Sequence, residues 1–312
     1  MTRLLALLLL VAAGTLPTAR AQKASPASAG PRLHIAAVAF DRDDRPVADL
    51  RASDIEVWIG GYRVPIETLT VIDASSAGQP GRLTVLLLDD TTLPPGLIPR
   101  VKDIARRFVE RMAPGDEMAI VALNGDAMKS SGDRNVLLRS IDAVGLLQAS
   151  GVQRVEDVGA HVLKTVAVLS QQLLERPGGR KTIVGIGPAR LFDTPIPNPI
   201  VGRDLRPEWT EAMRATAAAG THFYVIEPAG VGALPAYSGA AGFARETGGH
   251  TFLNTNDFNG AVDRIMGEAS NYYVITVADP PIRRTSDLRE LDVRVLRRGI
   301  TVRTRRALVG RP

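Results

Sequence analysis

Four polar residues, Asp89, Asp90, Thr91 and Thr92, follow directly on a run of apolar residues that begins after Arg82. A short apolar run of this kind predicts a strand that is buried on both faces of a sheet. In an open parallel sheet, ligands bind beyond the carboxyl ends of such strands. Two carboxylates and two hydroxyls at that edge therefore predict a binding site or the remains of one. A solvated acidic turn at the end of a strand is the alternative.

Acid–base catalysis is one chemistry that the neighbouring carboxylates of Asp89 and Asp90 could perform. Adjacent residues of a strand point to opposite faces, however, and this disfavours a shared catalytic centre. We therefore expect no catalytic residue here. A hydrolase that uses these carboxylates is the least favoured of three functional hypotheses.

Other motifs that could carry chemistry are weak. Residues 178–182 resemble a phosphate-binding loop, but they lack the spaced first glycine and precede a predicted strand instead of a helix. The four histidines are scattered without the spacing of metal ligands, and the sequence contains no G-x-S-x-G motif of a serine hydrolase.

Basic residues gather near the end of the chain. They are Arg294, Arg297, Arg298, Arg303, Arg305 and Arg306. We interpret them as the solvated face of a strand, and binding of an anionic partner is the alternative interpretation.

Composition restricts the class of protein. The net charge of +5 over 312 residues is too small to indicate a nucleic-acid partner. Cysteine is absent, which excludes disulfide bonds, thiol catalysis and a cysteine-linked lipid anchor. The sequence therefore favours a protein partner over nucleic acid, and it leaves the oligomeric state unknown.

The first residues have the pattern of a secretory signal. Arg3 precedes an apolar stretch, and Ala19, Arg20 and Ala21 supply the small-x-small pattern of a cleavage site. The apolar stretch is too short to cross roughly 30 Å of hydrocarbon. We therefore expect a signal peptide over residues 1–21, a linker over residues 22–31, no transmembrane segment and a secreted or periplasmic location.

The spacing of apolar residues differs between the two ends and the middle of the mature chain. Apolar residues alternate along residues 32–80 and again along 271–312, which predicts short strands with hairpins over 55–66 and 291–304. Residues 81–270 instead alternate short apolar runs with helical spacing, which predicts a mostly parallel sheet with helices on both faces. We therefore predict an α/β, Rossmann-like domain inserted in a small β-sandwich built from both chain ends.

Two shorter segments carry more local predictions. The proline-rich residues 189–207 are expected to form a loop, and residues 238–245 are expected to form a short helix.

Several segments, taken in order, resemble secreted bacterial proteins that carry a von Willebrand factor type A domain, of the Acidobacteria-type related family. The similar segments are residues 46–50 (PVADL) with 54–57 (DIEV), the apolar run that ends at Asp89, residues 113–116 (APGD), 246–249 (ETGG) and 272–275 (YYVI). The resemblance implies the Rossmann-like type A fold. It also implies a magnesium site at the top of the sheet, made by Asp-x-Ser-x-Ser and by a later threonine and aspartate.

On this resemblance Asp89 takes the first ligand position and Thr91 replaces the first serine. Leu93 stands where the second serine belongs, and a leucine side chain cannot bind a metal. The later threonine falls at residues 153–154 (Gln-Arg) and the later aspartate at residues 187–188 (Gly-Pro). The resemblance therefore implies a degenerate metal-ion-dependent adhesion motif without a cofactor, in which the guanidinium group at position 154 is a candidate replacement for the cation.

These observations favour a non-enzymatic, exported binding or scaffold protein with a protein partner. The predicted binding residues are Asp89, Asp90, Thr91, Thr92 and Asp193. The alternative is a magnesium-dependent adhesion module that uses Asp89 and Thr91 together with loop carboxylates such as Asp126 or Asp193, because Mg²⁺ prefers oxygen ligands.

Overall fold

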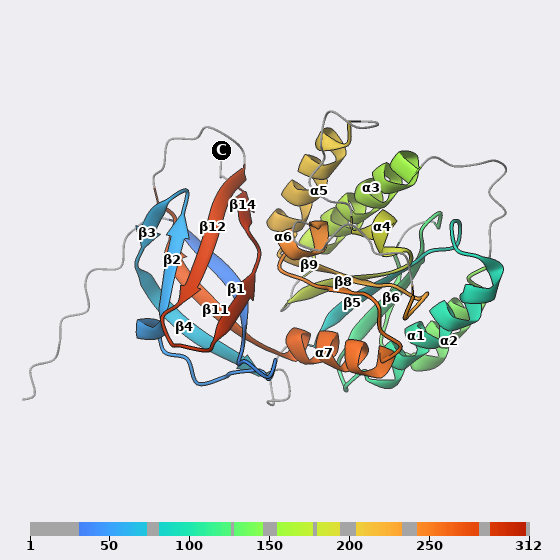
Figure 1. Cartoon of the computed structure of the whole chain (residues 1–312), viewed down its shortest axis with the longest axis horizontal. Helices are drawn as coiled ribbons and strands as arrows, with labels where there is room; N and C mark the ends of the chain where they lie inside the picture. Colours follow the sequence, from blue (N-terminus) through green and yellow to red (C-terminus); the bar gives the residue numbers. More distant parts are fainter. Residues whose placement is uncertain are drawn as a thin grey trace, which may run out of the picture. The chain divides into compact units, whose positions relative to one another are not determined.

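The apolar residues after Arg82 form the buried strand β5 (Leu83–Leu88), which lies inside a six-stranded sheet (Figure 1). The computed structural model describes residues 31–73, 81–125, 128–145, 155–176, 180–193, 204–232, 242–280 and 288–309. β5 pairs in parallel with β6 (Glu117–Ala122) on one side and with β8 (Lys181–Ile186) on the other. Both neighbours cover its backbone, and helices cover its two faces, which explains why almost every residue of the strand is apolar.

The strand order of this sheet is β10-β9-β8-β5-β6-β7. β9 (Thr221–Ile226) and β10 (Thr251–Phe252) continue the parallel pairing, whereas the short β7 (Ser130–Ser131) is antiparallel to β6. Along the chain this is a doubly wound order, in which the direction of strand addition reverses between β5 and β8. The predicted mostly parallel, Rossmann-like sheet is confirmed.

Helices cover both faces of the sheet (Figure 1). One face packs against α3 (Val155–Leu174), α4 (Ala189–Phe192), α5 (Arg206–Ala219) and α6 (Phe243–Glu246). The other packs against α1 (Ile98–Glu110), α2 (Arg134–Ala143) and α7 (Phe258–Ser270). Apolar residues spaced by three and four, as in α1, place one buried stripe on each helix.

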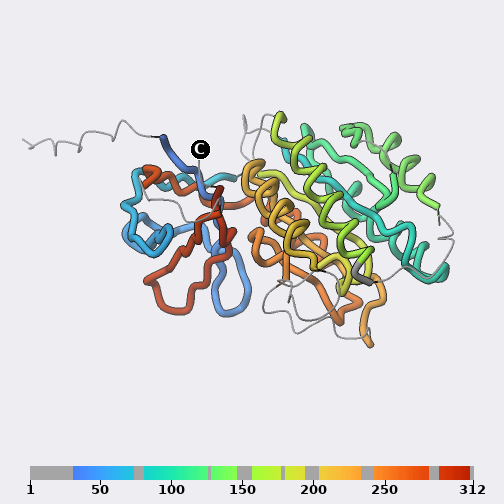
Figure 2. The backbone as a smooth tube through the Cα atoms, turned by 90° about the horizontal axis from the view of Figure 1, so that it is seen from above, coloured from blue at the N-terminus to red at the C-terminus, as the bar shows by residue number. Residues whose placement is uncertain are grey.

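Both ends of the mature chain form a β-sandwich. One sheet has the order β13-β1-β11-β4 and the other β14-β12-β2-β3. The strands are β1 (Arg32–Phe40), β2 (Ile55–Ile59), β3 (Tyr62–Val64), β4 (Ile66–Asp73), β11 (Asn271–Ala278), β12 (Leu288–Val295), β13 (Thr301–Thr304) and β14 (Ala307–Val309). Figure 2 shows the first described segments, in blue, beside the last ones, in red. The predicted sandwich of both chain ends is confirmed.

The sandwich has its own apolar core. Val57 and Ile59 from β2 and Ile275 from β11 have no exposed surface, and they lie between the two sheets. A short 3-10 helix, η1 (Ala52–Asp54), leads into β2. Because the strands of each sheet come from both ends of the chain, neither end contains a complete sheet.

Two local predictions were wrong. The expected hairpin over residues 291–304 does not form, because β12 pairs with β2 whereas β13 crosses to the other sheet and pairs with β1. The expected loop over residues 189–207 is helical at both ends: α4 begins at Ala189, and α5 begins at Arg206. Pro207 fits the first turn of α5 because the backbone N–H groups there have no partner within a helix.

Some predicted segments lie outside the described residues. They are the signal peptide (residues 1–21), all but the last residue of the linker (22–31) and the first half of the short helix expected over 238–245, whose described half overlaps α6. Within the described parts of the chain, no helix combines the length and the apolar character needed to cross a membrane.

Candidate functional site

The predicted site lies at the point where the strand order reverses. Asp89 follows β5 and Gly187 follows β8, and these two strands are neighbours in the sheet. In doubly wound sheets, ligands bind in the crevice that forms outside the carboxyl ends of the strands at this point. The fold therefore places Asp89 where a ligand would be expected. We call Asp89–Thr92 together with Gly187 the crest.

Asp89 directs its carboxylate at its own loop. Oδ1 accepts hydrogen bonds from the backbone N–H of Thr91 and of Thr92, both at 2.9 Å, and from the hydroxyl of Thr91 at 3.1 Å. Oδ2 accepts a hydrogen bond from the hydroxyl of Thr92. The side chain of Asp89 has no exposed surface. Both of its oxygens are therefore used to shape the turn after β5.

The neighbouring residues at the crest are also turned inward. Asp90 is buried and accepts a hydrogen bond from the backbone N–H of Asn124 at 3.2 Å. Burial raises the pKa of the Asp90 carboxyl. Thr91 and Thr92 are half-buried, and Leu93 belongs to the apolar core beneath α1. The structure thus brings Asp89, Asp90, Thr91 and Thr92 together, with the carboxylates inside and the threonines nearer the surface.

Gly187 occupies a position too tight for any side chain. A Cβ atom at this position would lie 2.5 Å from Cε2 of Phe192 and 2.9 Å from Cβ of Asp89. Phe192 is fully buried, so the aromatic ring cannot easily move away. This packing leaves no room for a carboxylate at residue 187, one of the two positions to which the aspartate of the adhesion motif was assigned.

Glu227 is a carboxylate at the same sheet edge that the sequence analysis missed. It follows β9, and its two oxygens accept hydrogen bonds from the backbone N–H of Ala189 at 2.8 Å and of Ala229 at 3.1 Å. Glu227 is buried. The signal was present in the sequence, because Glu227 directly follows the apolar run of β9. Its carboxylate connects two loops.

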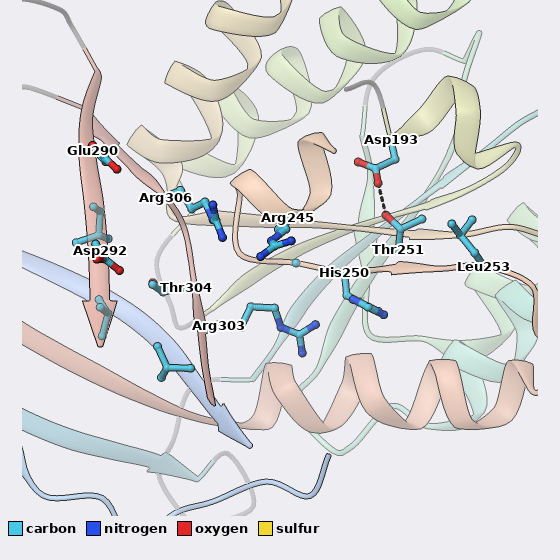
Figure 3. Close-up of a pocket in the computed structure, with 14 residues that line it drawn as sticks. Asp193, Arg245, His250, Thr251, Leu253, Glu290, Asp292, Arg303, Thr304 and Arg306 are labelled. Carbon is cyan, nitrogen blue, oxygen red and sulfur yellow. Dashed lines mark hydrogen bonds between the residues drawn. The ribbon is translucent and has the colours of Figure 1, made fainter. Parts of the chain in front are cut away.

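Asp193 follows α4 and accepts hydrogen bonds from residues outside the turn after β5. Its Oδ1 accepts a hydrogen bond from the backbone N–H of Ala244 at 2.8 Å, and its Oδ2 accepts one from the hydroxyl of Thr251 at 2.5 Å (Figure 3). Burial raises the pKa of the Asp193 carboxyl. Asp193 thus connects the segment after α4 to α6 and β10, and its hydrogen-bond partners among the described residues do not include any residue of the crest.

The oxygen atoms at the crest do not fit a magnesium site. Mg²⁺ requires near-octahedral coordination by oxygen atoms that are free to bind it. The oxygens of Asp89 already accept hydrogen bonds from Thr91 and Thr92, and Gly187 offers no side chain. Among the described residues, no group of three or more acidic or histidine side chains could hold a metal ion. Residues 126 and 153–154, named above as candidates, lie outside the described residues.

The C-terminal arginines divide into two groups. Arg294, Arg297, Arg298 and Arg306 are exposed, as predicted for a solvated face. For Arg303 and Arg305 the prediction of a solvated face was wrong, because both turn toward the α/β domain. Arg305 is 5% exposed and donates hydrogen bonds to the carbonyls of Thr216 at 3.2 Å and Thr221 at 3.0 Å. Burial lowers the pKa of Arg305 to about 10.

A cavity of about 630 Å³ lies between β10 and the strands β12 and β13 (Figure 3). Arg245, Arg303 and Arg306 line it together with His250 and Asp193. Burial, assisted by the positive charges of Arg303 and Arg264, lowers the pKa of His250 to about 4. The imidazole is therefore neutral at pH 7. Apart from Asp193 and the basic residues already noted near the C-terminus, this cavity was not predicted, because its walls come from segments distant in the sequence.

No protein-family model matches the sequence, and neither does any curated protein. Some solved structures are similar. Proximal thread matrix protein 1 from the mussel byssus has 11% identity and a TM-score of 0.43, and the match covers 68% of this chain and 51% of that one. The PilB minor pilin from Streptococcus sanguinis has 13% identity and a TM-score of 0.40 over 62% and 63% of the two chains.

A third similar structure is the manganese-loaded TRAP protein from Plasmodium vivax, with 11% identity and a TM-score of 0.35 over 76% of this chain and 96% of that one. The matched region spans about half of the mussel protein and less than two thirds of the pilin. These similarities concern the fold alone. Membership in the type A family resembled by the sequence stays a prediction.

Proposed function

We propose that this protein is a non-enzymatic, exported binding or scaffold protein whose α/β domain acts without a metal ion. The observation that carries the proposal is the inward orientation of Asp89, whose two oxygens accept hydrogen bonds from Thr91 and Thr92. A carboxylate in this state stabilises its own loop, and Asp89 has no exposed surface on which a ligand could contact it. Export rests on the signal-like pattern of residues 1–21.

The proposal also accounts for the other carboxylates near the sheet edge. Asp90, Glu227 and Asp193 all accept hydrogen bonds from backbone N–H groups, which makes them parts of the scaffold. An acid–base catalyst would need a carboxylate that can reach a substrate proton. We therefore propose that recognition uses the surface of the loops around the crest and not the carboxylates beneath them.

Thermal unfolding with and without magnesium tests this proposal. A ligand that binds only the folded state, at about 100 times its Kd, adds about 2.7 kcal/mol of stability. We expect millimolar MgCl₂ or MnCl₂ to leave the melting temperature of the mature protein within error of its value in EDTA. Calorimetric titration of the same sample with MgCl₂ should show no binding heat.

Two variants make this test specific. Asp89→Ala removes the acceptor that a metal would need, and Glu211→Ala removes a surface carboxylate that pairs with Arg214 and makes no hydrogen bond to the crest among the described residues. An increase in the melting temperature with Mg²⁺ that persists in Glu211→Ala but disappears in Asp89→Ala would refute the proposal and support the magnesium-dependent adhesion module. Capture of partners from an envelope fraction, carried out in EDTA and in Mg²⁺, should give the same proteins.

A further inference from the structure

A buried guanidinium group lies at the end of the six-stranded sheet opposite the crest. Arg180 directly precedes β8 and is 5% exposed. Its Nη2 donates a hydrogen bond to the hydroxyl of Tyr224 at 2.8 Å. Its Nε and Nη1 are buried and have no hydrogen-bond partner among the described residues, and no described carboxylate forms an ion pair with it. A buried charge is costly unless it is paired, so Arg180 calls for a further partner.

Two more polar atoms on the same face of the sheet have no partner. Thr182 lies two residues beyond Arg180, and the parallel pairing of β8 with β9 places it beside His222. Alternate residues of a strand project from one face, so these side chains and Tyr224 share the face that α7 covers. Oγ1 of Thr182 and Nδ1 of His222 are buried without a hydrogen-bond partner in the described part of the chain.

All of these atoms can donate a hydrogen bond. A guanidinium group has donors only, a threonine hydroxyl can donate, and a neutral imidazole carries one N–H that its tautomer can place on Nδ1. Burial, together with the charges of Arg180 and Arg305, keeps the pKa of His222 well below its ordinary value, so the ring is neutral. A ligand that contacts Arg180, Thr182 and His222 at once would therefore be an acceptor of hydrogen bonds.

Arg305 adds a second buried positive charge near Arg180. It lies between β13 and β14, and the hydrogen bonds of its guanidinium group go to main-chain carbonyls. After burial, the charge of Arg180 is the next cause of the lowered pKa of Arg305. The sandwich and the α/β domain therefore each contribute a buried arginine to this region, and the two repel each other.

The described carboxylates nearby compensate other arginines. Glu268 reaches Arg180 only through the hydroxyl of Tyr224, and it forms ion pairs with Arg264 and Arg303. The remaining carboxylate, Asp44, pairs with Arg264. Four guanidinium groups thus share two carboxylates in the described part of the chain, and the two most buried of the four pair with neither. The region carries an excess of positive charge.

We propose that a small monovalent anion of the size of chloride binds beside Arg180, Thr182 and His222. The guanidinium group supplies the charge and two N–H donors, and charge-assisted hydrogen bonds of this kind are the strong ones. A halide fits because it accepts hydrogen bonds from several directions, and because a close-packed interior has little room for a larger ion. The anion would also offset the charge of Arg305 and so stabilise the contact of the sandwich with the α/β domain. This inference is independent of the crest and of the proposed function.

Urea unfolding in chloride tests the inference. Sodium chloride replaces sodium gluconate at constant ionic strength, since gluconate is too large for a buried site. A ligand that binds only the folded state adds about 1.4 kcal/mol of stability for each tenfold rise in its concentration above its Kd. We expect this slope for the wild type with chloride and with bromide. Arg298→Gln, at an exposed arginine, is the matched control and should show the same slope.

Two variants make the test specific to the site. Arg180→Met removes the charge but keeps an apolar side chain of similar length, so its stability should no longer depend on chloride. In gluconate it should be at least as stable as the wild type, because no unpaired charge is buried. Thr182→Val keeps the shape of the side chain and removes one donor, which should raise the Kd for chloride about tenfold.

A crystal soaked in sodium bromide locates the anion directly. We expect an anomalous peak within hydrogen-bond distance of Nε or Nη1 of Arg180. A water molecule at that position in the presence of bromide, or bromide at surface arginines only, would overturn the inference. So would equal chloride slopes in the wild type and in Arg180→Met, which indicate a general salt effect, or no slope in either. The magnesium test of the proposed function is made at constant chloride, and Asp89→Ala should keep the full chloride dependence, so the two proposals fail separately.

Discussion

The hydroxyl of Tyr224 donates a hydrogen bond of 2.6 Å to Oε2 of Glu268, and both side chains are buried. The other carboxylate oxygen of Glu268 accepts hydrogen bonds from Arg264 at 3.1 Å and from Arg303. A single buried carboxylate therefore contacts β9, α7 and β13. Because β13 belongs to the sandwich, Glu268 couples the sandwich to the α/β domain.

Replacing Glu268 by glutamine should destabilise the protein strongly. The change leaves Arg303 without the charge that compensates its burial, whereas Arg264 keeps its ion pair with Asp44. Breaking a buried ion pair in this way costs about 3–5 kcal/mol. Urea unfolding followed by circular dichroism measures this difference. Glu211→Gln breaks an exposed pair with Arg214 and should cost no more than about 1 kcal/mol. Equal effects of the two variants would show that Glu268 does not have this role.

His250 should make the protein less stable as the pH falls from about 6.5 to 4. Burial lowers the pKa of His250 to about 4 in the folded state, whereas an unfolded histidine titrates near 6.5. Between these values the unfolded chain binds a proton that the folded chain does not, so stability decreases with decreasing pH by at most about 1.4 kcal/mol per pH unit.

Buried carboxyls with raised pKa values, such as Asp90 and Asp193, have the opposite effect on stability. Over part of this pH range the folded chain binds their protons before the unfolded chain does, so they make the protein more stable as the pH falls. The informative quantity is therefore the difference between the wild type and His250→Gln in urea unfolding between pH 4 and pH 7. The variant should lose stability less steeply toward low pH. His34→Gln, at an exposed histidine, should follow the wild type, and a slope unchanged in His250→Gln would contradict the prediction.

Gly187→Ala should destabilise the crest. The added methyl group would lie 2.5 Å from Phe192, and overpacking of a buried site costs about 1–3 kcal/mol. The matched control is Gly267→Ala in α7, where nothing lies within 4 Å of the new Cβ atom and alanine favours the helix by about 0.5–1 kcal/mol. Combining Gly187→Ala with Phe192→Leu should recover part of the lost melting temperature. Gly187→Ala with the stability of the wild type would refute the steric explanation.

Deleting residues 291–312 should unfold the sandwich. The deletion removes most of β12 and all of β13 and β14, which exposes Val57, Ile59 and Ile35, and each such side chain contributes about 1.5–3 kcal/mol when buried. The truncated protein should bind a hydrophobic dye or become insoluble. Deleting residues 310–312 alone leaves every described strand intact and serves as the control. An unchanged melting curve of the longer deletion would mean that the two ends are independent.

The α/β domain could be predicted from the sequence because its elements are long and strongly periodic. A strand is indicated by each of the apolar runs of β5, β8 and β9. A helix is indicated by the spacing of apolar residues in α1. The pairing of β12 and β13 was predicted wrongly because alternation shows that a segment is a strand but not which sheet it joins. The turn at Gly299 joins the two strands in sequence, whereas packing between the two sheets separates them.

The residue types at the crest could be predicted from the sequence, but the hydrogen bonds that these residues make could not. The position of Asp89 after a buried strand follows from the sequence, whereas its hydrogen bonds to Thr91 and Thr92 depend on how the loop turns back. The cavity beside β10 was harder to predict than the crest, because Arg245, Thr251 and Arg303 come from separate segments of the sequence that are brought together only in the folded protein. For Arg303 and Arg305, alternation with apolar residues suggested a solvated face, but here that face packs against the α/β domain.

The pairing of β1 with β11 has a kinetic consequence. His34 and Thr276 contact each other across 242 positions of the chain, so β1 has no partner until nearly all of the protein has been made. At about 5–20 residues per second, a ribosome needs roughly 10–50 s to cover that distance. During this time β1 and the edge of β2 that later pairs with β12 are unpaired and can associate with other chains. The sandwich should therefore form last, and its formation rate should limit the yield of the native protein.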